Sequence, residues 1–489
     1  MKILRELKYF SVAAIGALAL GGTPLRAQQQ PADPQQEQQP VAPIPAIRSP
    51  LASGADNGDA EETPNAQELT PDTRPLTGAE DLSLGSLPPA PSYWQPFVSF
   101  SETVDSNPNF STVGSDWGTW TSFFGGVDLH HASSVSDMSL NYIGGGMFSN
   151  GGTAQNGNIQ ELAFRDRFSF RRSTFSVFEQ FSYLPESLLG FAGLVGAGIP
   201  GSGGSGLGSQ FSAGGSILGL RGQNIYNTSA VEWDAKLSPR SSLTLVGDYM
   251  LLHDSESGSA NYGDTGFQAG YNYQLTPKDT IAASYLYSAY RYSNVNQSIN
   301  TNTILGSYGR RITGRLAFQI AAGPQFVSST FPITGSTSSE SISGSASTVN
   351  LQLTSALQYQ LRRALLSAAY MHGVTGGSGL LAGAKTNVLT GSVSSQVRRT
   401  IHVLWNVGYS RNVGIPTTST ATAQTTYDYW FTGVNVTHPF GRSLDIFLNY
   451  ELQYQDTSTN ECTGTGCSTN VIRNQIAFGM NLHKQPTPF

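Results

Sequence analysis

The chain has 489 residues with a net charge of -6, and only 12% of them are charged, whereas Gly, Tyr and Phe number 54, 21 and 24. Soluble globular proteins usually carry about 25% charged residues, so this composition argues against an ordinary soluble protein. The acidic balance also argues against binding of nucleic acid, which needs a basic face. Beyond the N-terminal region no run reaches about eighteen consecutive apolar residues, which excludes membrane-spanning helices.

The N-terminus predicts a secretory signal peptide over residues 1–27. Lys2, Arg5 and Lys8 precede an apolar run over residues 10–22, and small residues follow it. This order is typical of a cleaved export signal, and the run is too short to span a membrane comfortably. We place the cleavage near Ala27.

Residues 28–92 predict a disordered periplasmic linker. They are rich in Gln, Pro and acidic residues and begin with QQQPADPQQEQQP. Such a segment cannot bury enough apolar surface to offset the entropy of ordering it. Two roles remain open, namely a solvated spacer and a tether to peptidoglycan or a periplasmic partner.

Residues 93–489 alternate between apolar and polar side chains, the pattern of strands with one face in each environment. In soluble sandwiches strands are usually about five or six residues long, whereas these runs extend over roughly 10 to 15, enough to cross a membrane at a tilt. We therefore predict an all-β transmembrane antiparallel barrel. The alternation is clearest in residues 267–275, 349–361, 444–455 and 472–482.

The predicted connections alternate between tight turns and longer loops rich in Gly, Ser, Thr and Asn. Short periplasmic turns and longer outer loops are the usual asymmetry of outer-membrane barrels. One tight turn per hairpin gives about eighteen strands with both termini in the periplasm; sixteen remains the alternative, because the pattern blurs around 93–131 and 298–328. The tight turns are expected near 131–135, 170–173, 237–241, 275–279, 312–314, 361–363, 398–400 and 439–442.

The last predicted strand, NQIAFGMNLHK, followed by the terminal Phe489, is similar to the C-terminal signal that porin-type barrels present to the barrel-assembly machinery. Phe489 lies beyond Pro486 and Pro488, so residues 476–482 are an alternative carrier of this signal. At the level of architecture the chain resembles the uncharacterised porin-like outer-membrane barrels of Gram-negative bacteria. The resemblance implies an outer-membrane protein surrounded by lipid, and porins of this size are often homotrimers.

The longest outer loop, residues 184–226, is the third in order, and in porins the third loop commonly folds into the lumen. Its segment LPESLLGFAGLVGAGIP is apolar and would be costly to expose. It is therefore predicted either to narrow the lumen or to cap the surface and bind a partner. The charged candidates in this constriction loop are Glu186 and Arg221.

The phase of each strand places a set of charged side chains toward the lumen. Two interpretations are open, a pore wall whose field acts on solutes and a set of internal ion pairs that brace the barrel. These pore-lining candidates are Glu161, Arg165, Arg167, Glu232, Asp234, Lys236, Asp248, Arg315, Asp445, Glu451 and Arg473.

Cys462 and Cys467 bracket four residues of the last outer loop, and in an oxidising compartment this spacing favours a disulfide. A metal site would need two further ligands, and none lies nearby in the sequence. Only His253 and His372 fall near predicted outer ends, which favours rim histidines over an enzyme. We expect no catalytic residues and no cofactor.

These features favour a channel through which small hydrophilic solutes diffuse passively, with a lumen partly narrowed by the third loop. A barrel of about eighteen strands is wide enough for a water channel unless something fills it. The alternatives are a surface-exposed binding or structural barrel with a blocked lumen, and a polysaccharide-export barrel served by the Pro-rich segment.

Overall fold

The computed structural model describes residues 76–77 and 92–488, apart from 110–116, 153–155, 187–220, 256–259, 294–295, 334–341, 378–380, 399, 416–424 and 460–467. The predicted signal peptide, most of the predicted linker and both cysteines lie outside this part of the chain. None of the described residues forms a helix long and apolar enough to cross a membrane.

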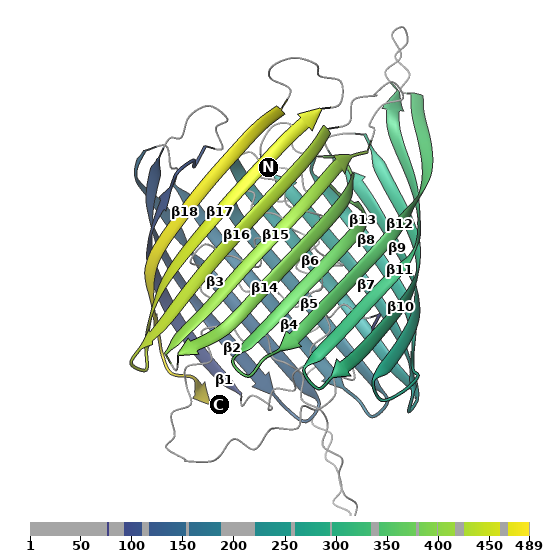
Figure 1. Ribbon diagram of the computed structural model, residues 1–489, viewed down its shortest axis with the longest axis horizontal. Helices are drawn as coiled ribbons and strands as arrows, with labels where there is room; N and C mark the ends of the chain where they lie inside the picture. Colours follow the sequence, from purple (N-terminus) through teal and green to yellow (C-terminus); the bar gives the residue numbers. More distant parts are fainter. Residues whose placement is uncertain are drawn as a thin grey trace, which may run out of the picture. The chain divides into compact units, whose positions relative to one another are not determined.

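Eighteen long strands, each paired with its sequence neighbours, build one antiparallel sheet (Figure 1). The strands are β1 Tyr93–Asp105, β2 Gly118–Ala132, β3 Ser136–Gly152, β4 Gly157–Ser169, β5 Ser173–Glu186, β6 Arg221–Ser238, β7 Ser241–Asp254, β8 Tyr262–Gln274, β9 Asp279–Tyr292, β10 Ser298–Thr313, β11 Leu316–Ile333, β12 Ile342–Gln360, β13 Ala364–Thr375, β14 Ala384–Arg398, β15 Ile401–Gly414, β16 Thr425–Phe440, β17 Leu444–Thr459 and β18 Ser468–His483.

The sheet closes on itself because β1 pairs with β18 from Phe97↔His483 to Asp105↔Gln475. A short bridge, β19 Thr487–Pro488, extends this seam by pairing with Tyr93 and Trp94. Closure removes the unpaired strand edges that could not be satisfied in lipid. The predicted barrel of eighteen strands is confirmed, and its last barrel strand ends at His483, before the terminal Phe489.

Eight tight turns lie at one end of the barrel, together with the start of β1 and the end of β18 (Figure 1). The connections at the other end include the longest ones, 187–220 among them. By the usual asymmetry of these barrels, the end with the tight turns is the periplasmic end. All eight turns lie within one or two residues of the positions that the sequence predicts.

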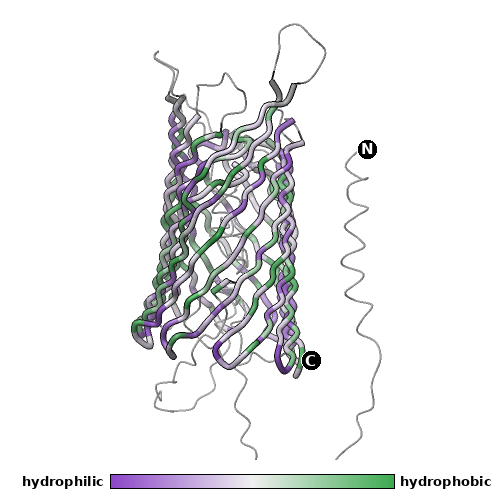
Figure 2. Tube along the Cα trace, turned by 90° about the vertical axis from the view of Figure 1, so that its right-hand side faces the viewer, coloured by the Kyte–Doolittle hydropathy of each residue, from purple (hydrophilic) through white to green (hydrophobic). Residues whose placement is uncertain are grey.

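The two faces of the wall are the reverse of those of a soluble protein. Large apolar side chains such as Ile304, Leu351 and Phe478 are exposed on the outside, whereas polar side chains such as Asn412 and Gln453 are buried. Figure 2 shows hydrophobic and hydrophilic positions alternating along the strands. A hydrocarbon exterior requires this arrangement, because the outer face is solvated by lipid and the inner face by polar groups.

Candidate functional site: the lumen wall and its outer mouth

Most of the charged pore-lining candidates lie on the inward face of the barrel, opposite the exposed apolar side chains of the same strands. On β6, for example, Glu232 is buried while Val231 and Trp233 are exposed. The candidates placed inward are Glu161, Arg165 and Arg167 on β4, Glu232, Asp234 and Lys236 on β6, Asp248 on β7, Asp445 and Glu451 on β17, and Arg473 on β18.

Three of the sequence-predicted candidates are placed differently from the prediction. Arg315 is exposed in the tight turn between β10 and β11, because β10 continues to Thr313 and shifts the turn by one residue. Glu186 and Arg221 are not loop residues, since β5 extends to Glu186, β6 begins at Arg221 and the two positions pair. The third outer loop is therefore shorter than predicted, and its apolar segment lies outside the described residues.

Several inward charges are held by partners within the wall. Arg473 Nη2 lies 2.6 Å from Asp105 Oδ2, and neither side chain is exposed. His483 Nε2 lies 3.2 Å from Asp445 Oδ2 near the periplasmic end. The Arg165 guanidinium lies 5.5 Å from the centroid of the Phe178 ring, a cation–π contact. These contacts fit the bracing interpretation for this part of the charged set.

A cavity of about 90 Å³ lies on the lumen wall and is lined by residues of the seven consecutive strands β7 to β13. Its polar lining includes the carboxylates of Asp248 and Asp264 and the amides of Gln268, Gln325 and Gln352. Asp264 Oδ1 accepts a hydrogen bond of 3.1 Å from the Ala289 backbone amide. Two carboxylates with no cation among the lining residues make this part of the wall acidic. Among the described residues, no group of three His, Cys, Asp or Glu side chains could hold a metal ion.

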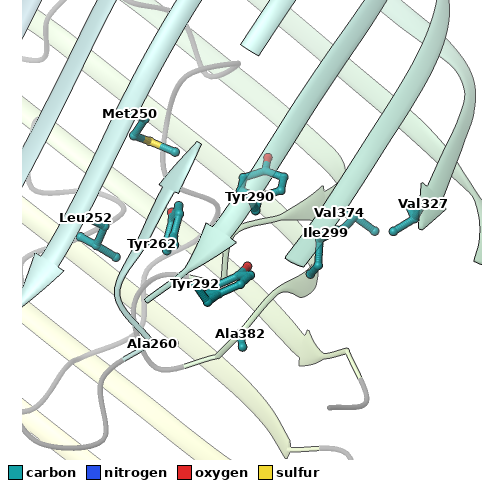
Figure 3. Packing of buried hydrophobic residues seen from close by; sticks show 10 residues of the cluster. All are labelled: Met250, Leu252, Ala260, Tyr262, Tyr290, Tyr292, Ile299, Val327, Val374 and Ala382. Atoms are coloured by element: carbon teal, nitrogen blue, oxygen red, sulfur yellow. The ribbon is translucent and has the colours of Figure 1, made fainter. Parts of the chain in front are cut away.

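Above the cavity an aromatic cluster lines the outer mouth of the barrel. Tyr262, Tyr290 and Tyr292 are buried, and the Tyr262 ring lies 5.5 Å from that of Tyr292 and 5.9 Å from that of Tyr290. Figure 3 shows the three rings between Met250 and Leu252 on one side and Ile299, Val327 and Val374 on the other. This cluster is thus an apolar patch on the inward face of the wall.

The described residues of the connection between β13 and β14, 376–377 and 381–383, pack on this cluster. Tyr292 donates a hydrogen bond of 2.9 Å to the Gly376 carbonyl, and Gln297 Nε2 donates one of 2.9 Å to the Ala382 carbonyl. Gly377 and Gly383 have φ of +85° and +89°, values that glycine adopts without strain. These described loop residues therefore fold inward against the wall of β8, β9 and β10 at the outer mouth.

The sequence by itself predicts no role for this connection. Its signal was present in the segment GGSGLLAG, where glycines that permit positive φ flank two leucines. The tyrosines at 290 and 292 carried a second signal, because both share the inward phase of β9 and a lumen wall is usually polar. Neither signal identifies the loop that packs on the rings.

A closed barrel of eighteen strands with a lipid-compatible exterior, a polar interior and short periplasmic turns defines a porin-like β-barrel of the outer membrane. No family model and no curated protein matches the chain. Solved structures give only distant similarities. They include Acinetobacter baumannii OccAB3, with 11% identity over 80% of this chain and 99% of that chain at a TM-score of 0.38. A BenF-like porin from Pseudomonas fluorescens Pf-5 has 12% identity over 80% and 99%, at a TM-score of 0.37.

Pseudomonas aeruginosa OccK2, in complex with glucuronate, has 10% identity over 80% of this chain and 98% of that chain at a TM-score of 0.37. At these values the assignment of this chain rests on its own barrel and on the two faces of its wall.

Proposed function

We propose that the protein is a channel through which small hydrophilic solutes diffuse passively across the outer membrane. The observation that carries the proposal is the polar inward face, which continues around a closed wall of eighteen strands. A barrel of eight strands leaves room only for side chains or one small ligand, whereas barrels of about 16 to 18 strands leave an aqueous channel. A barrel of this size can therefore hold a water-filled path.

The acidic part of the wall favours cations over anions of the same size. Asp248 and Asp264 lie on the same cavity between the aromatic mouth and the periplasmic end. Charged side chains lining a pore act on the ions that pass, and a low-dielectric wall strengthens their field. The inward-folded residues 376–377 and 381–383 support a narrowed outer mouth, and the third loop, residues 187–220, is a second proposed constriction. Homotrimer formation and cleavage near Ala27 stay predictions.

Planar-bilayer recording of the purified full chain tests the channel. Ohmic single-channel steps that scale with salt concentration are expected, with larger steps after deletion of residues 190–217, which leaves both strand ends intact. A barrel that folds in detergent and vesicles yet passes no current, with or without that deletion, contradicts the channel and favours a surface-binding or structural barrel with a blocked lumen.

A further inference from the structure

Two residues from the segment that precedes the barrel lie inside its lumen. Leu76 and Thr77 form a turn, and they are only 8% and 1% exposed. Their partners Gln268 and Asn272 face inward on β8, because Phe267, Tyr271 and Tyr273 of the same strand are exposed on the outside. The sequence placed this stretch in a periplasmic linker, so its contacts with the wall are a new feature.

Four hydrogen bonds from three wall side chains hold the turn. Asn272 accepts one of 3.0 Å from the Leu76 amide through Oδ1 and donates one of 2.8 Å to Thr77 Oγ1 through Nδ2. Gln268 Nε2 donates to the Thr77 carbonyl, and Gln319 Nε2 on β11 donates to the Leu76 carbonyl at 3.3 Å. Buried backbone groups need such partners, so the wall satisfies polar atoms that would otherwise be costly to remove from water.

Two glycines of the wall make room for the side chains of the turn. A Cβ at Gly309 on β10 would lie 2.7 Å from Leu76 Cδ2, and a Cβ at Gly270 on β8 would overlap the Thr77 side chain. Both positions face the lumen between polar neighbours. The wall is therefore shaped for this turn as well as hydrogen-bonded to it, and a bulky residue at either position would crowd the turn.

The strands that hold the turn, β8, β10 and β11, lie on the side of the barrel opposite the seam between β1 and β18. In a closed ring of eighteen strands, β10 is nine strands from β1 in either direction. Strand spacing of about 4.8 Å and a tilt of about 40° give a diameter of roughly 35 Å. The covalent chain from Thr77 to Tyr93 has sixteen links, counted as 93 minus 77, which span at most about 55 Å. The chain is long enough to join the two walls.

We propose that the lumen wall formed by β8, β10 and β11 carries a binding site for residues 76–77 of the same chain, which anchors the N-terminal segment inside the channel. The ligand is a turn with an apolar residue followed by a hydroxyl residue, recognised mainly through its backbone. The anchored turn displaces water from the periplasmic half of the lumen. This effect rests on the proposed channel, whereas the binding itself does not.

Disulfide trapping tests the binding. In a full-length Cys462→Ser/Cys467→Ser background, Thr77→Cys is combined with Gly270→Cys, whose side chain would lie against residue 77. The Cβ of residue 270 would start closer to that of residue 77 than the separation of about 4 Å that a disulfide needs. A small outward shift of the turn therefore lets mild oxidation in outer membranes link the two positions, as read by peptide mass spectrometry. The matched control is Thr77→Cys with Ser99→Cys, which is buried and faces the lumen from β1.

Preferential linking to position 270 supports the site. Equal linking to 270 and 99, or none to 270, overturns it. Because Gly270→Cys removes one of the two glycines, a second measurement keeps both of them. Thr77→Cys alone should be shielded from a water-soluble maleimide. Adding Asn272→Ala should raise the labelling rate at position 77 by roughly tenfold, the factor for about 1.4 kcal/mol of lost binding. An unchanged rate overturns the proposal.

Conductance then separates the binding from the channel. Gly309→Val should exclude the turn and raise the single-channel conductance, whereas Gly247→Val, which has no atom within 4 Å of an added Cβ and lies on the outward face, should not. Trapping at 270 in a barrel that passes no current supports the site and contradicts the channel. Current that is unchanged by Gly309→Val, with no preferential trapping, supports the channel and overturns the site.

Discussion

Arg473 and Asp105 form a fully buried ion pair that joins the last barrel strand to the first. Arg473 Nη2 and Nε lie 2.6 Å and 2.7 Å from the same carboxylate oxygen of Asp105. The Gln475 amide donates to that oxygen at 3.1 Å, and the Asn107 backbone amide donates to the other at 2.8 Å. The pair therefore lies on the seam where the sheet closes.

Asp105→Ala should destabilise the barrel by about 3–5 kcal/mol, because it leaves a buried guanidinium without its counter-charge. Urea titration of folding into phospholipid vesicles measures the loss. The control is Asp279→Ala, which removes a 3.6 Å contact with the half-exposed Arg310 and two hydrogen bonds, from Thr276 and Tyr308, near a turn. It should cost less, because Arg310 stays solvated. The double variant Asp105→Ala/Arg473→Met should recover much of the stability, and equal losses in Asp105→Ala and the double variant would contradict the account.

Glu179 and Asn227 are hydrogen-bonded on the outward face of β5 and β6, well inside the strands. Asn227→Ala should destabilise the barrel by about 1–3 kcal/mol, because the acid then faces hydrocarbon without that donor. Glu179→Leu/Asn227→Leu should be as stable as the parent, since neither polar group is left in the lipid. Vesicle refolding of Glu179→Leu, Asn227→Leu and the double variant gives the coupling energy, and additive losses would rule the interaction out.

Gly383→Val should release the inward-folded loop at the outer mouth. Residue 383 has φ of +89°, and an added Cβ would overlap Ile299 Cδ1. Single-channel conductance should rise, because residues 376–377 and 381–383 would no longer pack against the wall at the mouth. The matched control is Gly441→Val, which has φ of +79° in a periplasmic turn with no atom within 4 Å of the added Cβ. A conductance that rises equally in both variants would assign the effect to backbone strain.

Asp248→Asn/Asp264→Asn should lower the preference of the channel for cations. Both carboxylates line the cavity on the lumen wall, and the substitution keeps their size while it removes their charge. The reversal potential in a potassium chloride gradient should shift toward zero at low salt, where charges are least screened. Asp428→Asn serves as the control, because that carboxylate is hydrogen-bonded to Tyr409 on the outward face. An unchanged reversal potential would place the ion path away from β7 and β8.

The sequence by itself determined the strands and the side of the wall that each residue faces, and it predicted their number as about eighteen with sixteen as the alternative. These properties depend only on the phase and length of the alternation, as in β18, where Ile472 and Ile476 face outward and Arg473 and Gln475 inward. The predicted turn positions agree with the observed ones to within a residue or two. The prediction of Arg315 in a strand, where the structure has it in a turn, is an error of that size.

Only the tertiary structure decided which inward residues meet. Asp105 contacts Arg473 across 368 positions, Leu76 contacts Asn272 across 196, and Tyr292 contacts the backbone of Gly376 across 84. Alternation assigns a face but no partner, because the partner depends on how the ring closes and on which segments enter the lumen. The sequence of a polar segment predicts that it is exposed to water, yet a wall that supplies hydrogen-bond partners can bury such a segment.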